Sequence, residues 1–497
     1  MPRLSALAEN LTAETAFTVL ALARKLKALG KDIVELEIGD SPFPSTPHAK
    51  GAGIQAIEEN QTGYCPSLGL PRLREAAATF VAAEFGYPAR PENIVVASGA
   101  KPLEQYFAEA LLDPGDGVLV FSPHFPTYVP NLERRQARAV LAPLRVEHAF
   151  RPRVEDVRRF LATDPRPRAI FLNSPHNPTG GVATREDLAA IADLVRGTDL
   201  MIFSDEPYCH MVWAGRHASI LAEPGMLEHT VAAYTFSKSY SMSGWRIGFA
   251  VAHTEVVESI GKLINTTASC SPPLAQWAAQ AALEHDAATR DDYMDRFRRK
   301  VERLCAGLTG IDGLRVARPA GTFYVFPDAR PACNRLGISS HGLALYLLEG
   351  ADDDFGVACL GGECFGAAGR APPVAAFPTA LLTPSQLAAY FIVAINSSAN
   401  PRGRIAADDG NRLSARRSTP LNHHVRCRST SAWRGSAPSG TRVGPKDAPL
   451  TPQSIGIFQF APLNEKNIMS HLGIGKFVWC LARRTVGPAH RSSADNG

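Results

Sequence analysis

The feature that most constrains this chain is a regular alternation of strand-like and helix-like segments that starts near residue 94. Short apolar runs predict strands at 94–97, 118–121, 169–172, 200–204 and 231–235, and helical apolar spacing predicts helices at 101–112 and 185–195. Strands that alternate with helices form a largely parallel sheet with helices on both faces. The sequence therefore predicts an α/β fold built around one such sheet.

Functional residues are expected directly after each predicted strand, because ligands of such sheets bind outside the carboxyl ends of the strands. The segment Ser98-Gly99-Ala100-Lys101 follows the first strand and opens a helix, whose free N–H groups and dipole suit a phosphate. Phe125 follows the second strand, where its ring could stack on a planar group. Packing in the core is the alternative interpretation of Phe125.

The next two strand ends carry an amide and a carboxylate. Asn177 lies in a loop, 173–181, in which two prolines and two glycines restrict the backbone. Asp205 follows the fourth strand, and Tyr208 comes three residues later. An aspartate at a strand end is also a common helix cap, so Asp205 alone does not identify a site.

Lys238 lies just after the fifth strand, in a hydroxyl-rich turn. A lysine amine at the mouth of a buried strand loses solvation, which lowers its pKa and makes it a nucleophile able to form an imine with an aldehyde. Thr235, Ser237 and Arg246 flank it with two hydroxyls and a guanidinium, which are groups that bind phosphate. The competing interpretation is a surface lysine beside a structural arginine.

These strand-end groups together match the requirements of one cofactor, pyridoxal 5'-phosphate. Its aldehyde needs a lysine, its phosphate needs hydrogen-bond donors and a cation, and its ring nitrogen needs a carboxylate that keeps the ring protonated. Lys238, Asp205 and the phosphate-type groups at 98–101 and 235–246 meet these three needs. The amide and the phenol of the intervening loops are expected to hydrogen-bond the ring's phenolate oxygen, and Phe125 to cover the ring face.

Several motifs resemble those of the fold-type I, class I and II pyridoxal-phosphate-dependent aminotransferases, of the aspartate aminotransferase kind. They are Asn173-x-Pro-x-Asn177-Pro-Thr-Gly, Asp205-Glu-x-Tyr208, Ser237-Lys238 with Arg246 eight residues after the lysine, Asp113-Pro-Gly-Asp116, and Pro319-Ala-Gly-Thr-Phe-Tyr-x-Phe326. The resemblance runs from about residue 15 to about residue 370. It implies a large domain with a mainly parallel seven-stranded sheet flanked by helices, a smaller α/β domain, and a homodimer with shared active sites.

The resemblance also implies roles for individual residues toward the cofactor. Lys238 is expected to form the Schiff base and to carry the proton between the amino acid and the cofactor. Asp205 is expected to pair with the ring nitrogen, and Asn177 and Tyr208 with the phenolate oxygen. Tyr64 is expected to reach the phosphate of the neighbouring subunit.

Substrate contacts are expected from Gly39, Asn177 and Lys101. Gly39 matches a loop glycine near the substrate carboxylate, and Lys101 matches a lysine that contacts the distal carboxylate in some aspartate-using members. An ordinary solvated lysine in a first helical turn is the alternative for Lys101. The implied reaction is a ping-pong transfer of an amino group from an L-amino acid, such as an acidic or aromatic one, to a 2-oxo acid.

The resemblance weakens towards the C-terminus. Family members usually carry an arginine that grips the substrate α-carboxylate in a strand after a glycine-rich loop. Arg370 is the nearest candidate in this chain, and 371–378 contains no arginine. Two alternatives to transamination therefore stand: a C–S lyase on the same scaffold, or a cofactor-binding protein with impaired turnover. The expected parts are an N-terminal arm with part of the small domain (1–45), a large cofactor-binding domain (46–285), a small C-terminal domain (286–370) and a divergent, basic, disordered tail (371–497).

Composition sets the remaining expectations. Residues 401–497 contain 15 Lys or Arg and 5 Asp or Glu, whereas residues 1–400 contain 37 and 43. The basic tail is either a genuine appendage, able to touch nucleic acid or an anionic surface, or the product of a shifted reading frame. The N-terminus lacks an apolar signal core and no stretch is apolar enough to span a membrane, so a cytoplasmic protein is expected. The nine cysteines lack metal-ligand spacing, which argues against a metal site.

Overall fold

The computed structural model describes residues 3–11, 13–366 and 391–394 of the 497-residue chain. Its α-helices are α1 (Ala6–Asn10), α2 (Thr15–Ala28), α3 (Pro47–Glu58), α4 (Pro71–Phe85), α5 (Ala100–Leu111), α6 (Tyr128–Arg134), α7 (Val154–Thr163), α8 (Arg185–Val195), α9 (Thr254–Ala268), α10 (Pro273–His285), α11 (Ala287–Thr309), α12 (Arg330–Leu336) and α13 (Ser340–Glu349). The predicted tail lies outside the described residues except for 391–394. The predicted divisions at residues 45, 285 and 370 stay predictions.

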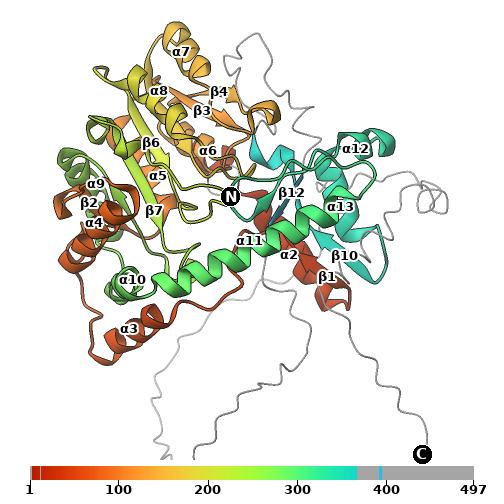
Figure 1. The fold of residues 1–497 in the computed structure, drawn as a ribbon, viewed down its shortest axis with the longest axis horizontal. Coiled ribbons are helices and arrows are strands. Elements are labelled where there is room, and N and C mark those ends of the chain that lie inside the picture. Colours follow the sequence, from red (N-terminus) through yellow and green to blue (C-terminus); the bar gives the residue numbers. More distant parts are fainter. Residues whose placement is uncertain (1–2, 12, 367–390, 395–497) are drawn as a thin grey trace, which may run out of the picture. The chain divides into compact units, whose positions relative to one another are not determined.

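The largest sheet among the described residues has seven strands (Figure 1). In the order in which neighbours pair, they are β2 (Ile94–Ala97), β8 (Gly248–Val251), β7 (Thr230–Thr235), β6 (Met201–Asp205), β5 (Pro167–Asn173), β3 (Gly117–Ser122) and β4 (Arg138–Pro143). Strand β8 is antiparallel to both of its neighbours, whereas the four pairs from β7 to β4 are parallel. The prediction of a mainly parallel seven-stranded sheet is confirmed.

Helices cover both faces of this sheet, because alternate residues of each strand point to opposite faces. On one face, side chains such as Val120 and Phe203 pack against α5 and α9. On the other face, Leu119 and Ile202 pack against α7 and α8, and α4 and α10 cover the strands near β2. With both faces closed, ligands have access only to the ends of the strands.

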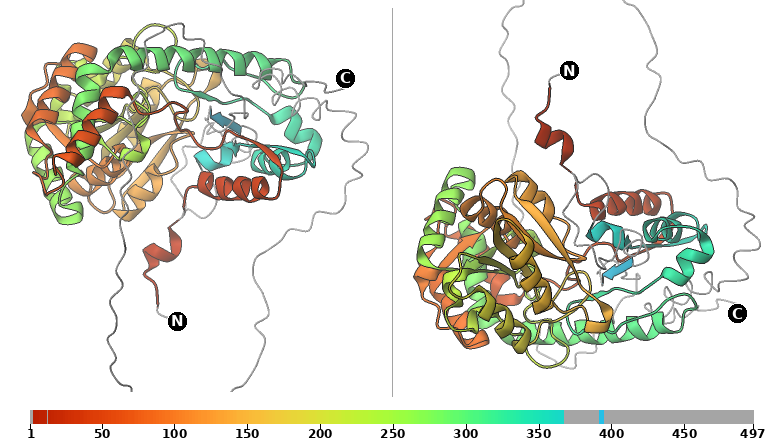
Figure 2. Two further views of the ribbon diagram at one scale, coloured as in Figure 1. Left: turned by 90° about the horizontal axis from the view of Figure 1, so that it is seen from below. Right: turned by 90° about the horizontal axis from the view of Figure 1, so that it is seen from above.

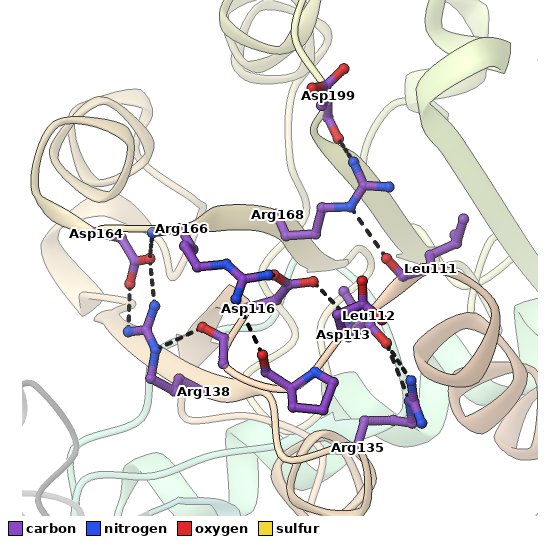
Figure 3. Close-up of polar contacts among 12 residues, drawn as sticks. Leu111, Leu112, Asp113, Asp116, Arg135, Arg138, Asp164, Arg166, Arg168 and Asp199 are labelled. Atoms are coloured by element: carbon purple, nitrogen blue, oxygen red, sulfur yellow. Dashed lines mark hydrogen bonds and ion pairs between the residues drawn. The ribbon is translucent and has the colours of Figure 1, made fainter.

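Hydrogen bonds and ion pairs of charged residues connect the starts of the parallel strands β3, β4 and β5 (Figure 3). The Arg138 guanidinium donates to both oxygens of Asp164 (2.9 and 2.7 Å), and Arg166 Nη2 donates to Asp116 Oδ1 (2.8 Å). The other Asp116 oxygen accepts from the Asp113 backbone N–H (2.8 Å). The Asp113–Asp116 motif thus fixes the turn before β3, at the opposite end of the sheet from the carboxyl ends of the strands.

Two smaller sheets combine segments from both halves of the chain. Strand β1 (Asp32–Glu35) pairs in parallel with β10 (Phe355–Ala358), and β12 (Phe391–Ala394) pairs antiparallel with β11 (Leu360–Gly361) and β9 (Tyr324–Val325). Helix α2 contacts β1, β10 and β11, and Figure 2 shows it beside these strands. The long helix α11 follows α10 and contacts β9, so it connects the large sheet to these smaller ones (Figure 1).

Several strands were not predicted from the sequence, among them β4, β8 and β12. Strand β4 escaped prediction because it begins with Arg138 and ends with Pro143. Strand β8 escaped prediction because it starts two residues after Arg246 and runs antiparallel, so it does not continue the alternation of strands and helices. Strand β12 lies within the segment predicted to be disordered, so that prediction is wrong for residues 391–394. Its sequence, Phe-Ile-Val-Ala, contains no arginine. No helix among the described residues is both long and apolar enough to cross a bilayer.

Candidate active site

The candidate site is assembled at the carboxyl ends of β5, β6 and β7. Asn173, the last residue of β5, lies opposite Asp205, the last residue of β6. The Asn173 side chain donates to the Asp205 backbone oxygen (Nδ2–O 2.8 Å) and accepts from the Asn177 backbone N–H (Oδ1–N 2.8 Å). Asn173 therefore holds the loop that carries Asn177 beside the strand that carries Asp205.

Asp205 is a buried carboxylate with one short hydrogen bond. The Tyr128 hydroxyl donates to its Oδ2 over 2.5 Å. Burial raises the pKa of Asp205 to about 6, because a low-dielectric surrounding disfavours the charged form, while the Tyr128 hydrogen bond and the Lys238 ammonium act in the opposite direction. The carboxylate is therefore mostly ionised at neutral pH and can hold a cationic partner.

Lys238 lies in a partly buried position beside two aromatic rings. Its Nζ donates to the Gly39 backbone oxygen (2.6 Å) and lies 5.6 Å from the ring centroid of Phe323 and 5.9 Å from that of Tyr208. Burial lowers the pKa of Lys238 to about 8; neighbouring cations add to this effect and Asp40 opposes it. A substantial fraction of the neutral, nucleophilic amine is therefore present just above neutral pH.

Asn177, Tyr208 and Tyr324 form a buried polar cluster. The two phenol oxygens are 3.0 Å apart, and Asn177 Nδ2 lies 3.4 Å from the Tyr208 oxygen and 3.5 Å from the Tyr324 oxygen. Asn177 Oδ1 has no hydrogen-bond partner among the described residues. A Cβ on Gly39 would lie 2.1 Å from the Tyr324 hydroxyl oxygen, so the cluster needs glycine there. The long Asn177 contacts leave its amide able to donate to a better acceptor.

The residues predicted to bind phosphate, named the phosphate pocket below, lie at the amino end of α5: Ser98, Gly99, Thr235, Ser237 and Arg246. Gly99 caps the helix with a φ of 99°, and a Cβ there would lie 2.6 Å from Arg246 Nη2. Arg246 Nη2 donates to the Ser98 backbone oxygen (3.2 Å), and the Thr235 and Ser237 hydroxyl oxygens are 2.9 Å apart. Helix N–H groups, two hydroxyls and a guanidinium are thus gathered at one place, which suits a dianion.

Lys101, in the first turn of α5, is engaged within the chain. It forms an ion pair with Glu14, the residue that precedes α2. Its ammonium also lies 5.3 Å from the ring centroid of Phe125. Phe125 is partly buried and packs edge-on against Tyr128, with ring centroids 5.8 Å apart. Both interpretations of Phe125, core packing and ring stacking, are compatible with this position.

Tyr64 is the one predicted cofactor contact that is not gathered with the others within this chain. Its side chain is 92% exposed, and it forms no hydrogen bond or ring contact with other described residues. The expected contact with the phosphate of a neighbouring subunit stays a prediction.

Comparison with known proteins adds a second line of evidence to this geometry. The model of the family described as aminotransferase class I and II matches residues 31–383. The chain belongs to the class I and II aminotransferases. Similar relatives include the aspartate/prephenate aminotransferase of Thermus thermophilus, 36% identical over 63% of this chain and 81% of the relative. Another is the arginine–pyruvate transaminase of Pseudomonas aeruginosa, 34% identical over 68% of this chain and 83% of the relative. The solved structure of the Thermus thermophilus aspartate aminotransferase with maleate has a TM-score of 0.69 and 31% identity, over 79% of this chain and 95% of that one.

The residues of this aminotransferase fit the cofactor of its family, pyridoxal phosphate. The phosphate pocket supplies donors and a cation where only a glycine leaves room. Asn177 Nδ2 makes only long contacts, 3.4 and 3.5 Å, with the two phenol oxygens, so it can donate to a stronger acceptor such as a phenolate. Asp205 offers a buried carboxylate, and Lys238 an amine of lowered pKa, at adjacent strand ends. The comparisons favour transamination over the alternative C–S lyase reaction.

Three further residues belong to the surroundings of the site and were not predicted from the sequence. Tyr324 completes the polar cluster, and its place in the aromatic Pro319–Phe326 motif was the available signal. Tyr128 donates to Asp205 and belongs to the aromatic segment after β3. Glu104 is a buried carboxyl group on α5, 2% exposed, and its only signal in the sequence was its helical spacing from Ala100, Phe107 and Ala108.

Proposed function

We propose that this aminotransferase moves the α-amino group of an L-amino acid to a 2-oxo acid in two half-reactions, at the carboxyl ends of β5, β6 and β7. The observation that carries the proposal is the Lys238 ammonium of lowered pKa, held by Gly39 and next to the strand that ends in Asp205. Pyridoxal phosphate supplies an aldehyde that takes up the amino group and a ring that accepts electrons.

Lys238 is proposed to act at two stages of each half-reaction. Its neutral amine holds the cofactor between reactions and gives way to the amino group of the substrate. The freed Nζ then takes the proton from Cα of the amino acid and delivers it to the carbon that receives the amino group. A pKa of about 8 suits both steps, because the same nitrogen must accept and release a proton near neutral pH.

The other site residues are proposed to fix the cofactor. The Asp205 carboxylate holds a proton on the ring nitrogen, and the Asn177 amide and the Tyr208 hydroxyl donate to the phenolate oxygen. The phosphate pocket, together with the first-turn N–H groups of Ala100 and Lys101, binds the phosphate. Support comes from the burial of Asp205, Asn177 and Tyr208 at adjoining strand ends.

Substrate binding is proposed to rely on Gly39 and Asn177 for the α-carboxylate. An arginine in this role is missing from β12, and Arg370 lies outside the described residues. This absence is the specific observation that favours the second candidate function, a protein that binds the cofactor but turns over slowly. Relatives named for aspartate, prephenate and arginine span both signs of side-chain charge, so the preferred amino acid is left to experiment.

The active enzyme is proposed to be a homodimer, with Tyr64 crossing to the neighbouring phosphate pocket. Tyr64 and the α3 residues Ile54 and Ile57 are exposed in the single chain, by 92%, 48% and 56%. Burying such side chains against a second copy would be favourable. Light scattering of the cofactor-loaded protein tests the dimer, and the cytoplasmic location stays a prediction.

The decisive experiment compares wild type, Lys238→Ala and the control Lys262→Ala, a lysine exposed on α9. Each protein is loaded with pyridoxal phosphate, treated with borohydride and digested, and the modified peptide is identified by mass spectrometry. The label is expected on Lys238 in wild type and control, and nowhere in Lys238→Ala. Transamination is then followed as 2-oxo acid released from aspartate, phenylalanine and arginine in single half-reactions.

The outcomes separate the candidate functions. Release of 2-oxo acid with conversion of the cofactor to its amine form supports transamination. A labelled Lys238 with no 2-oxo acid from any amino acid supports the slow-turnover candidate. Pyruvate released from a sulfur amino acid, with no amine form of the cofactor, would support a lyase. A label that persists in Lys238→Ala contradicts the assignment of the lysine.

A further inference from the structure

Glu104 is a buried carboxyl group to which the proposed reaction gives no role. It lies on α5 with only 2% of its surface exposed. Its Oε2 accepts hydrogen bonds from Thr127 Oγ1 (2.6 Å) and from Asn131 Nδ2 (3.1 Å). Thr127 is the N-cap residue of α6 and Asn131 lies within that helix, so one carboxylate oxygen anchors the first turn of α6 to α5.

Tyr128 lies between these two donors and points to the site. It is the first residue of α6, is 2% exposed, and donates its hydroxyl to Asp205 Oδ2 over 2.5 Å. Its ring packs edge-on against Phe171, with centroids 5.1 Å apart. Helix α6 has only seven residues, so its position depends on tertiary contacts rather than on its own stability.

Glu104 and Asp205 also interact electrostatically. Burial and the neighbouring Asp205 carboxylate raise the pKa of Glu104 well above its ordinary value, whereas Asp205 keeps a pKa of about 6. Two nearby carboxyl groups in a buried place do not both ionise readily. Burial and the charge of Asp205 thus both act against ionisation of Glu104.

We propose that Glu104 is a positioning residue for the cofactor: by anchoring the first turn of α6 it holds the Tyr128 hydroxyl on Asp205, and so fixes the carboxylate that faces the ring nitrogen. The inference rests on the proposed function, because Asp205 is given its cofactor contact there. Glu104 does not touch the cofactor itself, and its influence passes through Tyr128. A purely structural role would stabilise α6 without changing the behaviour of Asp205.

The experiment is a double-mutant cycle on the full chain. The variants are Glu104→Leu, Glu104→Gln, Tyr128→Phe and Glu104→Leu with Tyr128→Phe; Glu109→Leu, on the same helix and partly exposed, is the matched control. Three quantities are measured: the dissociation constant of pyridoxal phosphate, the pH midpoint of the absorbance change of the bound cofactor, and the thermal midpoint of the cofactor-free protein. Gln keeps an oxygen acceptor for Thr127 and Asn131, whereas Leu removes it.

Glu104→Leu is expected to weaken cofactor binding about tenfold and to move the pH midpoint of the cofactor absorbance by about one unit, the size of effect that a disturbed buried hydrogen-bond network produces. Glu104→Gln should stay within about twofold of wild type in binding, because the acceptor is retained. In the Tyr128→Phe background, Glu104→Leu should weaken cofactor binding by less than about a further twofold, because the effects of coupled residues are not additive.

The proposal is overturned if Glu104→Leu matches Glu109→Leu in binding and in pH midpoint, or if its full effect persists in the Tyr128→Phe background. Should Glu104→Leu fail to fold, Thr127→Ala and Asn131→Ala remove the same hydrogen bonds from the α6 side and must move the same pH midpoint. Failure of the proposed function is separate: wild-type protein would then not attach the cofactor to Lys238. If the wild-type protein attaches the cofactor to Lys238 and Glu104→Leu changes neither cofactor binding nor the pH midpoint, only the positioning role is disproved.

Discussion

At the scale of single residues, the pKa of Lys238 predicts how the cofactor-free enzyme captures its cofactor. Only the neutral amine attacks an aldehyde, and with a pKa of about 8 the Lys238 side chain is neutral in half of the molecules at that pH. We expect the rate of covalent capture to rise about tenfold per pH unit below that value and to level off above it. Stopped-flow absorbance of the cofactor-free protein mixed with pyridoxal phosphate measures this rate.

The same pKa has a defined effect on stability. The folded-state pKa of Lys238, about 8, lies below the ordinary value of 10.5, so between these values the unfolded chain binds more protons than the folded one. The free energy of unfolding, relative to Lys238→Met, should therefore rise with pH across that window. A capture midpoint near the ordinary lysine pKa, with parallel stability curves for the two proteins, contradicts the lowered value.

Residues that follow strands could be predicted from the sequence, whereas their partners could not. Lys238, Asp205 and Asn177 each follow an apolar run, and the strand rule together with the family motifs selects them. Tyr324 lies 116 residues from Tyr208 along the chain, although their hydroxyl oxygens are 3.0 Å apart. Apolar periodicity reveals the elements but does not say which loops meet, so contacts of this kind need the three-dimensional structure.

At the scale of elements, one ion pair joins the start of α2 to the start of α5. The side chains of Lys101 and Glu14 are 43% and 18% exposed. Both residues act electrostatically on the site, because Lys101 lowers the pKa of Lys238 and Glu14 raises that of Tyr324. A substrate with an acidic side chain that seeks Lys101 has to displace Glu14.

Removing the Glu14 carboxylate should therefore favour acidic substrates. We expect Glu14→Gln to raise the ratio of kcat/KM for aspartate to that for phenylalanine about fivefold, while stability changes by less than about 1 kcal/mol, as is usual for a partly exposed pair. Steady-state kinetics with both amino acids measure the ratio. Glu9→Gln, on the exposed helix α1, serves as the control. An unchanged or lowered ratio in Glu14→Gln would show that Lys101 does not contact the substrate side chain.

Elements that belong to the regular alternation of strands and helices could be predicted, and elements outside it could not. The predicted strand 94–97 and helix 185–195 match β2 and α8 residue for residue. Strand β12 was missed although it lies in a continuous apolar run, 387–395, because the whole of 371–497 was assigned to a divergent, disordered tail. What makes β12 a strand is its pairing with β9 and β11, which are formed by residues far away in the chain.

At the scale of the whole molecule, β12 lies beyond the part of the chain that matches the family. The matched region ends at residue 383, and the motifs that carry the resemblance end earlier, whereas β12 begins at Phe391. Strands β9 and β11 do not pair with each other; each pairs with β12. The smaller three-stranded sheet, which includes Tyr324 of the polar cluster, therefore depends on residues beyond those that the family model matches.

Two shortened proteins and one point variant test this dependence. A chain ending at residue 400 retains β12, whereas a chain ending at residue 366 leaves β9 and β11 without their shared neighbour. We expect the thermal midpoint of the shorter protein to lie at least about 3 °C below that of the longer one, which for a chain of about 400 residues corresponds to losing roughly 2.5 kcal/mol. Val393→Pro in the full-length chain should lower the midpoint similarly, because proline is poorly accommodated between two strands and lacks the N–H donor. Val393→Pro leaves the length and charge of the tail unchanged. If the thermal midpoint falls similarly in Val393→Pro and in the chain ending at residue 366, the lost stability is assigned to β12. If it falls only in the shortened chain, the lost stability is assigned to other residues after 366.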